Sequence, residues 1–283
     1  MFIIWGSRTN SRILRWFGFD SHQTVHSLRF FRKALDVSQL TPQVVRSHGC
    51  LFSLRNTDLI NLKIALVGAH EYDVTSFLLR HAYVSDVFVD VGANIGYYTV
   101  ILGKRLTSGR VVSIEPYQSS VAQLRENIRL NKLTNVTVVP SAAWAQSNVK
   151  LPLYSPDEHN LGANTLLKLG TQISVSTTVT LDELLKHLEV NAVDIVKIDV
   201  EGAEKEVILG MTASLARFRP RFVLCALDHP ESQQRSLTCG LIQEIGYEEI
   251  DWRTDVPLSQ VDGGARMAFF RSVPSSVLSQ STP

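Results

Sequence analysis

The chain has 283 residues, of which 45% are hydrophobic and 19% charged, as expected for one sizeable α/β domain with extensions. The net charge is only +1, so no strong overall field favours nucleic acid, and we expect no nucleic-acid partner. Cys50, Cys225 and Cys239 form no C-x-x-C pair, which argues against a disulfide framework and fits a reducing compartment. No apolar run is long enough for a transmembrane helix, and MFIIWG is too short for a signal-peptide core, so we predict a cytoplasmic protein.

The N-terminal region has a basic, amphipathic pattern. Basic side chains such as Arg12 alternate with large apolar ones such as Trp16. This pattern predicts amphipathic helices packed on the main domain with a solvated basic face, and a peripheral membrane contact is the alternative. We therefore expect an N-terminal helical extension over 1–55, an α/β domain over 56–273 and a disordered, Ser-rich tail over 274–283.

Two elements are predicted ahead of the central motif. Residues 62–68 (LKIALVG) form a continuous apolar run, which predicts a strand. Residues 71–82 place Val74, Phe77 and Leu78 on one side of a helix. We expect both elements to lie beside the ligand-binding cleft.

The most informative stretch is FVDVGANIGYYTVI, residues 88–101. A short apolar run predicts a buried strand ending at Asp90, and an apolar helical pattern follows a turn. The turn consists of small or turn-forming residues, among them Gly92, Ala93, Asn94 and Gly96. A strand, a Gly-rich turn and a helix together predict a nucleotide-binding unit, because glycines allow unusual backbone angles and close approach of a ligand. A purely structural turn is the alternative.

The charge at this turn indicates the ligand. The spacing is D-x-G-x-N-x-G rather than G-x-G-x-x-G, so Asp90 lies where a dinucleotide would place its pyrophosphate. A carboxylate repels phosphate and suits a cation, and we therefore predict the sulfonium S-adenosylmethionine.

A second strand is predicted over 110–114 (RVVSI), ending at Glu115-Pro116, and a helix follows over 119–131. An acidic side chain at this strand end can accept both ribose hydroxyls of a nucleoside. Glu115 follows Asp90 by 25 residues, which supports an adenosine ligand without choosing between NAD and S-adenosylmethionine.

The third strand, 135–140, leads into a turn that begins with Ser141 and Ala142. We expect these small residues to lie over the adenine ring. A polar region with two prolines follows, and it predicts a small β excursion with strands near 149–154 and 172–178.

A helix is predicted over 180–190, where Thr180 and Glu183 form a capping box. The later elements are a core-facing helix, a fifth strand, another helix and a final pair of antiparallel strands, predicted at 207–218, 222–227, 237–245, 247–252 and 265–271. A closing antiparallel pair favours a methyltransferase sheet over an all-parallel nicotinamide-binding one.

The second informative stretch is VDIVKIDVEGAE, residues 193–204. A buried strand carries Lys197 and ends at Asp199, and Glu201 and Glu204 follow directly. Ligands of doubly wound sheets lie beyond the carboxyl ends of the strands, so we expect these side chains near Asp90 and Glu115. The alternative is a salt-bridged strand end with acids that favour a helix N-terminus, and Glu204 fits that role as well as a catalytic one.

These motifs resemble the FkbM family of S-adenosylmethionine-dependent methyltransferases. The resemblance rests on VFVDVGANIGYYT (87–99), IEP (114–116), VTLDELL (179–185) and VKIDVEGAEKEVILG (196–210). It implies a class I methyltransferase fold, Rossmann-like and doubly wound, whose seven-stranded sheet has its last strand antiparallel. It also implies O-methylation of a sugar or another hydroxylated small molecule.

The resemblance and the positions of residues at the strand ends together predict a cofactor site and a catalytic group. The predicted cofactor-binding residues are Glu71, Asp90, Gly92, Ala93, Asn94, Gly96, Glu115, Pro116, Ser141 and Ala142. The predicted catalytic residues are Lys197, Asp199 and Glu201, with His229 as a second candidate base. We expect Asp199 or Glu201 to accept the proton of the acceptor hydroxyl or to orient it, and Mg²⁺ held by the two carboxylates is an open alternative.

One departure from the family concerns the end of the fifth strand. Family members often have a Glu-Ile-His run where this chain has Ala226-Leu227-Asp228-His229. This difference and the basic N-terminus support a non-catalytic protein that retains the fold as one alternative, and an NAD-dependent oxidoreductase is a separate one. A nucleic-acid methyltransferase is disfavoured by the near-neutral charge and by the lack of an aromatic motif for a flipped base.

Overall fold

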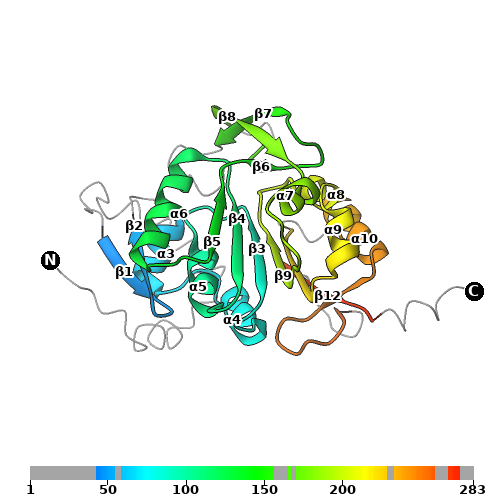
Figure 1. Cartoon of the computed structure of the whole chain (residues 1–283), viewed down its shortest axis with the longest axis horizontal. Helices are drawn as coiled ribbons and strands as arrows, with labels where there is room; N and C mark the ends of the chain where they lie inside the picture. The colour runs from blue at the N-terminus through cyan, green and yellow to red at the C-terminus, as the bar shows by residue number, and fades with distance from the viewer. Residues whose placement is uncertain are drawn as a thin grey trace, which may run out of the picture.

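A twisted seven-stranded sheet forms the centre of the molecule (Figure 1). The computed structural model describes residues 43–54, 59–155, 165–166, 170–227, 233–258 and 267–274. In spatial order the strands are β11 (Tyr247–Ile250), β12 (Met267–Ser272), β10 (Phe222–Ala226), β9 (Ile195–Ile198), β3 (Val87–Val91), β4 (Arg110–Ile114) and β5 (Val136–Val139). Strand β12 runs antiparallel to both of its neighbours, while β10, β9, β3, β4 and β5 are mutually parallel.

This order confirms the predicted class I methyltransferase fold. The final antiparallel pair was expected to close the sheet, and the structure adds that β12 inserts between β10 and β11. Insertion gives β12 a hydrogen-bonded neighbour on both sides. Because successive side chains of a strand point to opposite faces, the buried Phe269 and Phe270 lie on opposite faces of the sheet.

Helices cover both faces of the sheet (Figure 1). One group is α3 (Leu59–Val67), α4 (Tyr72–His81), α5 (Tyr97–Arg105) and α6 (Gln118–Leu130). The other group is α7 (Leu181–His187), α8 (Glu204–Leu209), α9 (Thr212–Phe218) and α10 (Gln233–Glu244). Successive strand residues face opposite layers: Phe88 belongs to the core under the first group, and Val89 to the core under the second. Burial on both faces explains why the parallel strands are continuous apolar runs in the sequence.

One prediction about the N-terminal part is wrong, and another is contradicted only over residues 43–54. Of the strand predicted over 62–68, residues 62–67 belong to helix α3 and Gly68 follows that helix. Asn61 and Ile64 are buried and Ala65 is exposed, which is a helical arrangement. A short apolar run by itself does not distinguish a strand from a buried helix. Within the expected helical extension, the described residues form a β-hairpin of β1 (Gln43–Ser47) and β2 (Cys50–Leu54), while 1–42 lie outside the described residues.

The helix predicted over 207–218 is interrupted. Two short helices, α8 and α9, meet at Gly210 and Met211. A Cβ on Gly210 would overlap the backbone carbonyl of Trp144, so the chain at the break lies directly against another segment. The apolar periodicity of the sequence does not reveal such a contact.

A second, small sheet confirms the predicted β excursion. It comprises β6 (Ala142–Ala143), β8 (Thr171–Val179) and β7 (Lys150–Ser155), in that spatial order. In Figure 1 it lies beyond the carboxyl ends of β4 and β5. Among the described residues, no helix has the length and apolar character needed to span a membrane.

Candidate active site

The Gly-rich turn joins β3 to α5 as predicted. Gly92, Asn94 and Gly96 all have positive φ, at 77°, 50° and 84°. The turn is anchored to the neighbouring strand, because the N–H groups of Gly92 and Ala93 both donate to the carbonyl oxygen of Ile114, at 2.9 and 3.1 Å. The sequence therefore has glycine at two of the three positions where φ is positive. Asn94 occupies the third, and asparagine is one of the residue types that tolerate this left-handed backbone region.

The glycines are also required by packing. A Cβ on Gly92 would overlap the carbonyl oxygen of Asp199, and a Cβ on Gly96 would overlap the side chain of Leu124. The Gly-rich turn thus packs directly on Asp199, the residue that follows β9, and this brings the two sequence motifs into contact.

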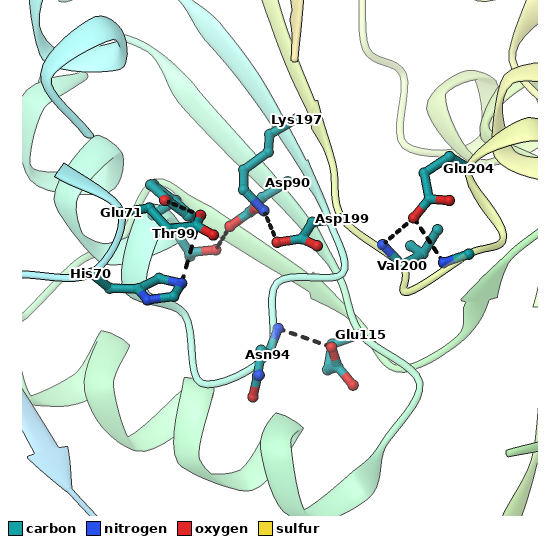
Figure 2. Close-up of polar contacts among 12 residues, drawn as sticks. His70, Glu71, Asp90, Asn94, Thr99, Glu115, Lys197, Asp199, Val200 and Glu204 are labelled. Carbon is teal, nitrogen blue, oxygen red and sulfur yellow. Dashed lines mark hydrogen bonds and ion pairs between the residues drawn. The ribbon is translucent and has the colours of Figure 1, made fainter. Parts of the chain in front are cut away.

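Glu115 lies beside this turn. Its Oε2 accepts the N–H of Asn94 at 2.9 Å (Figure 2). Its Oε1 accepts the N–H of Tyr117, also at 2.9 Å. Burial raises the pKa of Glu115 to about 7, although the two N–H donors oppose that shift. A carboxylate has about four acceptor positions, so both oxygens can still accept hydroxyl groups.

Asp90 is completely buried. Its Oδ2 accepts the hydroxyl of Thr99 at 2.6 Å, and Thr99 in turn hydrogen-bonds Ser113 at 2.7 Å. Within the described residues, Oδ1 has no hydrogen-bond partner. Burial raises the pKa of Asp90, and the charge of Lys197 opposes that shift. Asp90 therefore lies in the protein interior next to the site, and its carboxylate is not exposed on the surface.

Lys197 is the central cation of the site. It is 1% exposed, and its Nζ donates to Oδ2 of Asp199 at 3.0 Å. The same Nζ lies 4.8 Å from the ring centroid of Tyr98. Burial alone lowers the pKa of Lys197, but the charges of Asp199, Asp90 and Glu71 outweigh it and raise that pKa. Lys197 is thus held in its charged form by carboxylates from three different segments.

Glu71 joins this group from the segment before α4. Its Oε2 accepts the hydroxyl of Tyr98 at 2.7 Å and lies 3.6 Å from Nε2 of His70. Glu71 has a φ of 41°, unusual for a residue other than glycine. Figure 2 shows Glu71, Asp90, Lys197 and Asp199 gathered on one side of the cofactor turn. Asp199 and Glu71 are the accessible members, each with a side chain that is 18% exposed, and both can therefore meet a ligand.

The loop after β9 contains the other two predicted acids. Glu201 is partly exposed and has a φ of 53°, and its carbonyl oxygen accepts the hydroxyl of Thr165 at 2.7 Å. Glu204 is buried, and its Oε1 accepts the N–H groups of Val200 and Gly202, at 3.3 and 3.0 Å. Burial raises the pKa of Glu204 to about 7. Its contacts give Glu204 the structural role that the sequence left open.

The remaining predicted residues differ in their exposure. Pro116 follows Glu115 and is partly exposed, and Ser141 follows β5 and is also partly exposed. Ala142 is buried and pairs with Thr178 in the small sheet. The predicted base His229 lies outside the described residues.

Several members of the site were missed by the sequence analysis. Tyr98 and Thr99 appeared there only as part of an apolar helix, and His70 was not considered. No local signal identifies Tyr98, because its partners Glu71 and Lys197 are distant in the sequence. Within the described part of the chain, no group of three or more His, Cys, Asp or Glu side chains is placed to hold a metal ion.

The arrangement fits a cationic adenosyl ligand. Three carboxylates surround one lysine, Oδ1 of Asp90 is buried without a described partner, and Glu115 retains acceptor capacity at the neighbouring strand end. The acidic surplus suits a sulfonium better than a pyrophosphate.

Comparison with known proteins agrees with this chemistry. Residues 90–253, more than half of the chain, match the model of the methyltransferase FkbM domain. The hexuronic acid methyltransferase AglP of Haloferax volcanii is 35% identical over 146 residues, which are 51% of this chain and 58% of that protein. This chain therefore spans little more than half of that relative's length.

Two further proteins are similar. The tRNA(Phe) (4-demethylwyosine(37)-C(7)) aminocarboxypropyltransferase of Methanocaldococcus jannaschii is 33% identical over 96 residues, 34% of this chain and 36% of that protein. Among solved structures, a methyltransferase FkbM from Methylobacillus flagellatus KT superposes with a TM-score of 0.48 at 16% identity, covering 74% of this chain and 52% of that one.

Proposed function

Because this chain belongs to the methyltransferase FkbM family, we propose that it transfers a methyl group from S-adenosylmethionine to a hydroxyl oxygen of a sugar or glycosylated small molecule. Membership makes the domain an S-adenosylmethionine-dependent methyltransferase and removes the NAD-dependent oxidoreductase from consideration. The observation that carries the proposal is the contact between the cofactor turn and Asp199, whose carboxylate is bound by Lys197 and is partly accessible.

The strand ends provide the residues that would hold the cofactor. Glu115 would accept the ribose hydroxyls through the acceptor capacity left beside its bond to Asn94, and the turn of Gly92, Asn94 and Gly96 would let the backbone approach the adenosyl group. When bound, S-adenosylmethionine supplies an electrophilic methyl group on its sulfonium. Asp199 and Asp90 favour that positive charge through their own negative charge.

The acceptor hydroxyl needs alignment and a partner for its proton. Alignment behind the methyl group accounts for much of the rate of such transfers. Asp199 and Glu201 are the two partly exposed carboxylates of the β9 end. We assign to one of them the task of accepting the hydroxyl proton or orienting the hydroxyl, which is worth about 10²–10⁴-fold.

Lys197 and Glu204 support these carboxylates without contacting the acceptor. Lys197 donates to Asp199 and fixes its position, and Glu204 binds two N–H groups of the loop that carries Glu201. Both are buried, so their role is to position the loop and not to meet substrate.

The nature of the acceptor comes from the relatives. The similarity to a hexuronic acid methyltransferase favours a sugar hydroxyl as the acceptor. The similarity to a tRNA-modifying transferase concerns a shorter region, and exclusion of nucleic acid stays a prediction that rests on the near-neutral net charge.

Methyl transfer by Asp199→Asn and Glu201→Gln tests the assignment. We expect one of the two to lose about 10²-fold or more in kcat at saturating S-adenosylmethionine. The affinity for S-adenosylmethionine should change by less than about threefold in Glu201→Gln and should fall in Asp199→Asn, which loses a negative charge near the sulfonium. Labelled methyl transfer to uronic acids and to glycans, with calorimetry for cofactor binding, gives both quantities. Glu206→Gln, a partly exposed acid on α8, is the matched control and should retain full turnover.

Near-normal turnover by both variants would remove the carboxylates from the proton-transfer step. Binding of S-adenosylmethionine by the unmodified chain without transfer to any hydroxylated acceptor would favour the non-catalytic alternative.

A further inference from the structure

We propose that the β1–β2 hairpin is a positioning element of the cofactor site, acting through Asn127 on the Gly-rich turn and through Ser47 on the segment that leads to Glu71. The hairpin, residues 43–54, lies before the family-matching region of 90–253. The inference rests on the proposed cofactor site and adds a part of the chain that the family motifs do not contain.

The hairpin is built to stay in one register. Its two-residue turn is His48-Gly49, with φ of 47° and 79°, and positive φ at both positions matches the right-handed twist of the strands. Cys50 and Phe52 are buried in the core under α4 and α5, and the ring of Phe52 stacks on Tyr97 with centroids 5.5 Å apart. The hairpin is therefore part of the folded domain.

Amide side chains of α6 satisfy the outer edge of β2. The N–H groups of Leu51 and Ser53 point away from β1 and donate to Oδ1 of Asn131 and of Asn127, both at 2.8 Å. The carbonyl oxygens of the same two residues accept Nδ2 of Asn131 at 2.6 Å and Nε2 of Gln123 at 2.7 Å. These three amides recur every four residues and so share one face of α6, where they take the place of a neighbouring strand.

Asn127 is the amide that also reaches the cofactor turn. It is fully buried, and while its Oδ1 binds the hairpin its Nδ2 donates to the carbonyl oxygen of Ile95 at 2.8 Å. Ile95 lies between Asn94 and Gly96, which are two of the three positive-φ residues of the turn. One amide therefore links the backbone of β2 to the backbone of the turn. Asn131 docks the hairpin by the same chemistry but its other bond goes to Asn127 within the helix.

The tip of the hairpin reaches the other side of the site. The buried hydroxyl of Ser47 donates to the carbonyl oxygen of Gly68 at 2.6 Å. His48 hydrogen-bonds the hydroxyl of Tyr97 at 3.2 Å, and that hydroxyl accepts the N–H of His70 at 3.0 Å. These contacts hold the short segment before Glu71, whose own backbone has an unfavourable positive φ and needs such support.

The decisive comparison is between Asn127→Ala and Asn131→Ala, two matched truncations one helical turn apart. Both should lower the melting temperature, because both uncover the edge of β2. Only Asn127→Ala should weaken S-adenosylmethionine binding, by about tenfold, which corresponds to one backbone hydrogen bond. Asn131→Ala should change that affinity by less than about twofold. Calorimetry well below both melting temperatures separates affinity from stability.

A second pair of variants tests the contact made by the hairpin tip. It tests the proposed positioning role even if Asn127→Ala does not fold. Ser47→Ala removes the bond to Gly68, whereas Lys104→Met removes a bond to Gly49 on the same turn at 2.7 Å without touching the segment before Glu71. We expect weaker cofactor binding, seen as a raised KM for S-adenosylmethionine at unchanged kcat, for Ser47→Ala alone.

Affinities equal to wild type in Asn127→Ala and Ser47→Ala, with only the melting temperatures lowered, would reduce the hairpin to a structural role and overturn the inference. Lack of S-adenosylmethionine binding by the unmodified chain would instead overturn the proposed function, and this inference with it.

Discussion

At the scale of single residues, the site gathers charges away from water. Lys197 and Asp90 are buried, and Glu115 and Glu204 both have a pKa raised to about 7. A carboxyl group with a raised pKa prefers its neutral form in the folded protein. The arrangement costs stability near neutral pH, and a cationic cofactor bound here, as we propose, would offset that cost. Such perturbed groups are common at functional sites.

The pH dependence of stability tests the state of Glu115. Its pKa is about 7 in the folded chain against an ordinary 4.5, so the folded state binds the proton more tightly. Stability is therefore greatest below the ordinary pKa and falls as pH rises through about 7, by about 3 kcal/mol for the full shift. Glu115→Gln should flatten this decline by that amount in urea unfolding between pH 5 and 8, while Glu204 maintains a decline of its own.

Glu115→Gln also tests how the affinity for S-adenosylmethionine depends on pH. Ionised Glu115 is the better acceptor for ribose hydroxyls, so the affinity of the unmodified chain for S-adenosylmethionine should rise with pH through about 7. The variant should bind more weakly without that rise. Parallel stability and affinity curves in the two proteins would show that Glu115 does not ionise in this range.

At the scale of elements, two loops determine the site by packing on each other. The β3–α5 turn and the end of β9 come so close that Gly92 has no room for a side chain. Glu71, Asn94 and Glu201 all have positive φ without being glycine, so three separate loops are in an uncommon conformation around one centre. Uncommon backbone angles that gather in one place are typical of functional sites, where the surrounding contacts maintain them.

Gly92→Ala and Gly68→Ala separate the two reasons for glycine. The positions have almost the same φ, 77° and 76°, but a Cβ on Gly68 meets nothing within 4 Å. Gly68→Ala should cost only the strain of a positive φ in a residue with a side chain, about 1 kcal/mol of unfolding free energy. Gly92→Ala should cost about 3 kcal/mol or more and abolish cofactor binding, because it displaces the backbone at Asp199.

Chemical denaturation with calorimetry measures both effects. Equal losses of stability in the two variants, with cofactor binding retained in Gly92→Ala, would show that the two loops can separate without consequence.

At the scale of the whole molecule, stability and ligand chemistry lie at opposite ends of the sheet. At the amino ends of β3, β9 and β10, Arg221 binds Asp86 at 2.7 Å, Asp194 at 3.0 Å and the carbonyl oxygen of His81 at 3.3 Å. Asp194 also accepts the N–H of Val87 at 2.8 Å. The Lys197 and Glu115 groups lie at the carboxyl ends, as expected for a doubly wound sheet.

Arg221→Met tests this separation. It leaves the buried Asp86 without its cation and should lower the unfolding free energy by about 2 kcal/mol, since the pair is only partly shielded from water. The affinity for S-adenosylmethionine should stay within about twofold of wild type, because the substitution is at the far end of the strands. Arg217→Met, on the exposed side of α9, is the control and should change stability by less than about 0.5 kcal/mol. A large loss of cofactor affinity in Arg221→Met would contradict the separation.

The sequence by itself determined the features that short patterns encode. Strands β3, β4 and β9, the Gly-rich turn and the helix capped by Thr180 were predicted at the correct places, and Thr180 does accept the N–H of Glu183 at 3.2 Å. Apolar periodicity and turn chemistry act over a few residues, so they are visible without a structure. The pairing of Lys197 with Asp199 belongs to the same class, because the two lie on one strand end.

Only the tertiary structure decided how these pieces support one another. The apolar run of α3 was equally compatible with a strand, and the roles of Tyr98 and of Glu204 depend on partners that meet only in the folded chain. The clearest case is Asn127, which has the sequence pattern of an ordinary polar helix residue and yet joins the hairpin to the Gly-rich turn. Its two partners lie 74 and 32 residues away, and a contact over that distance depends on how the whole chain packs.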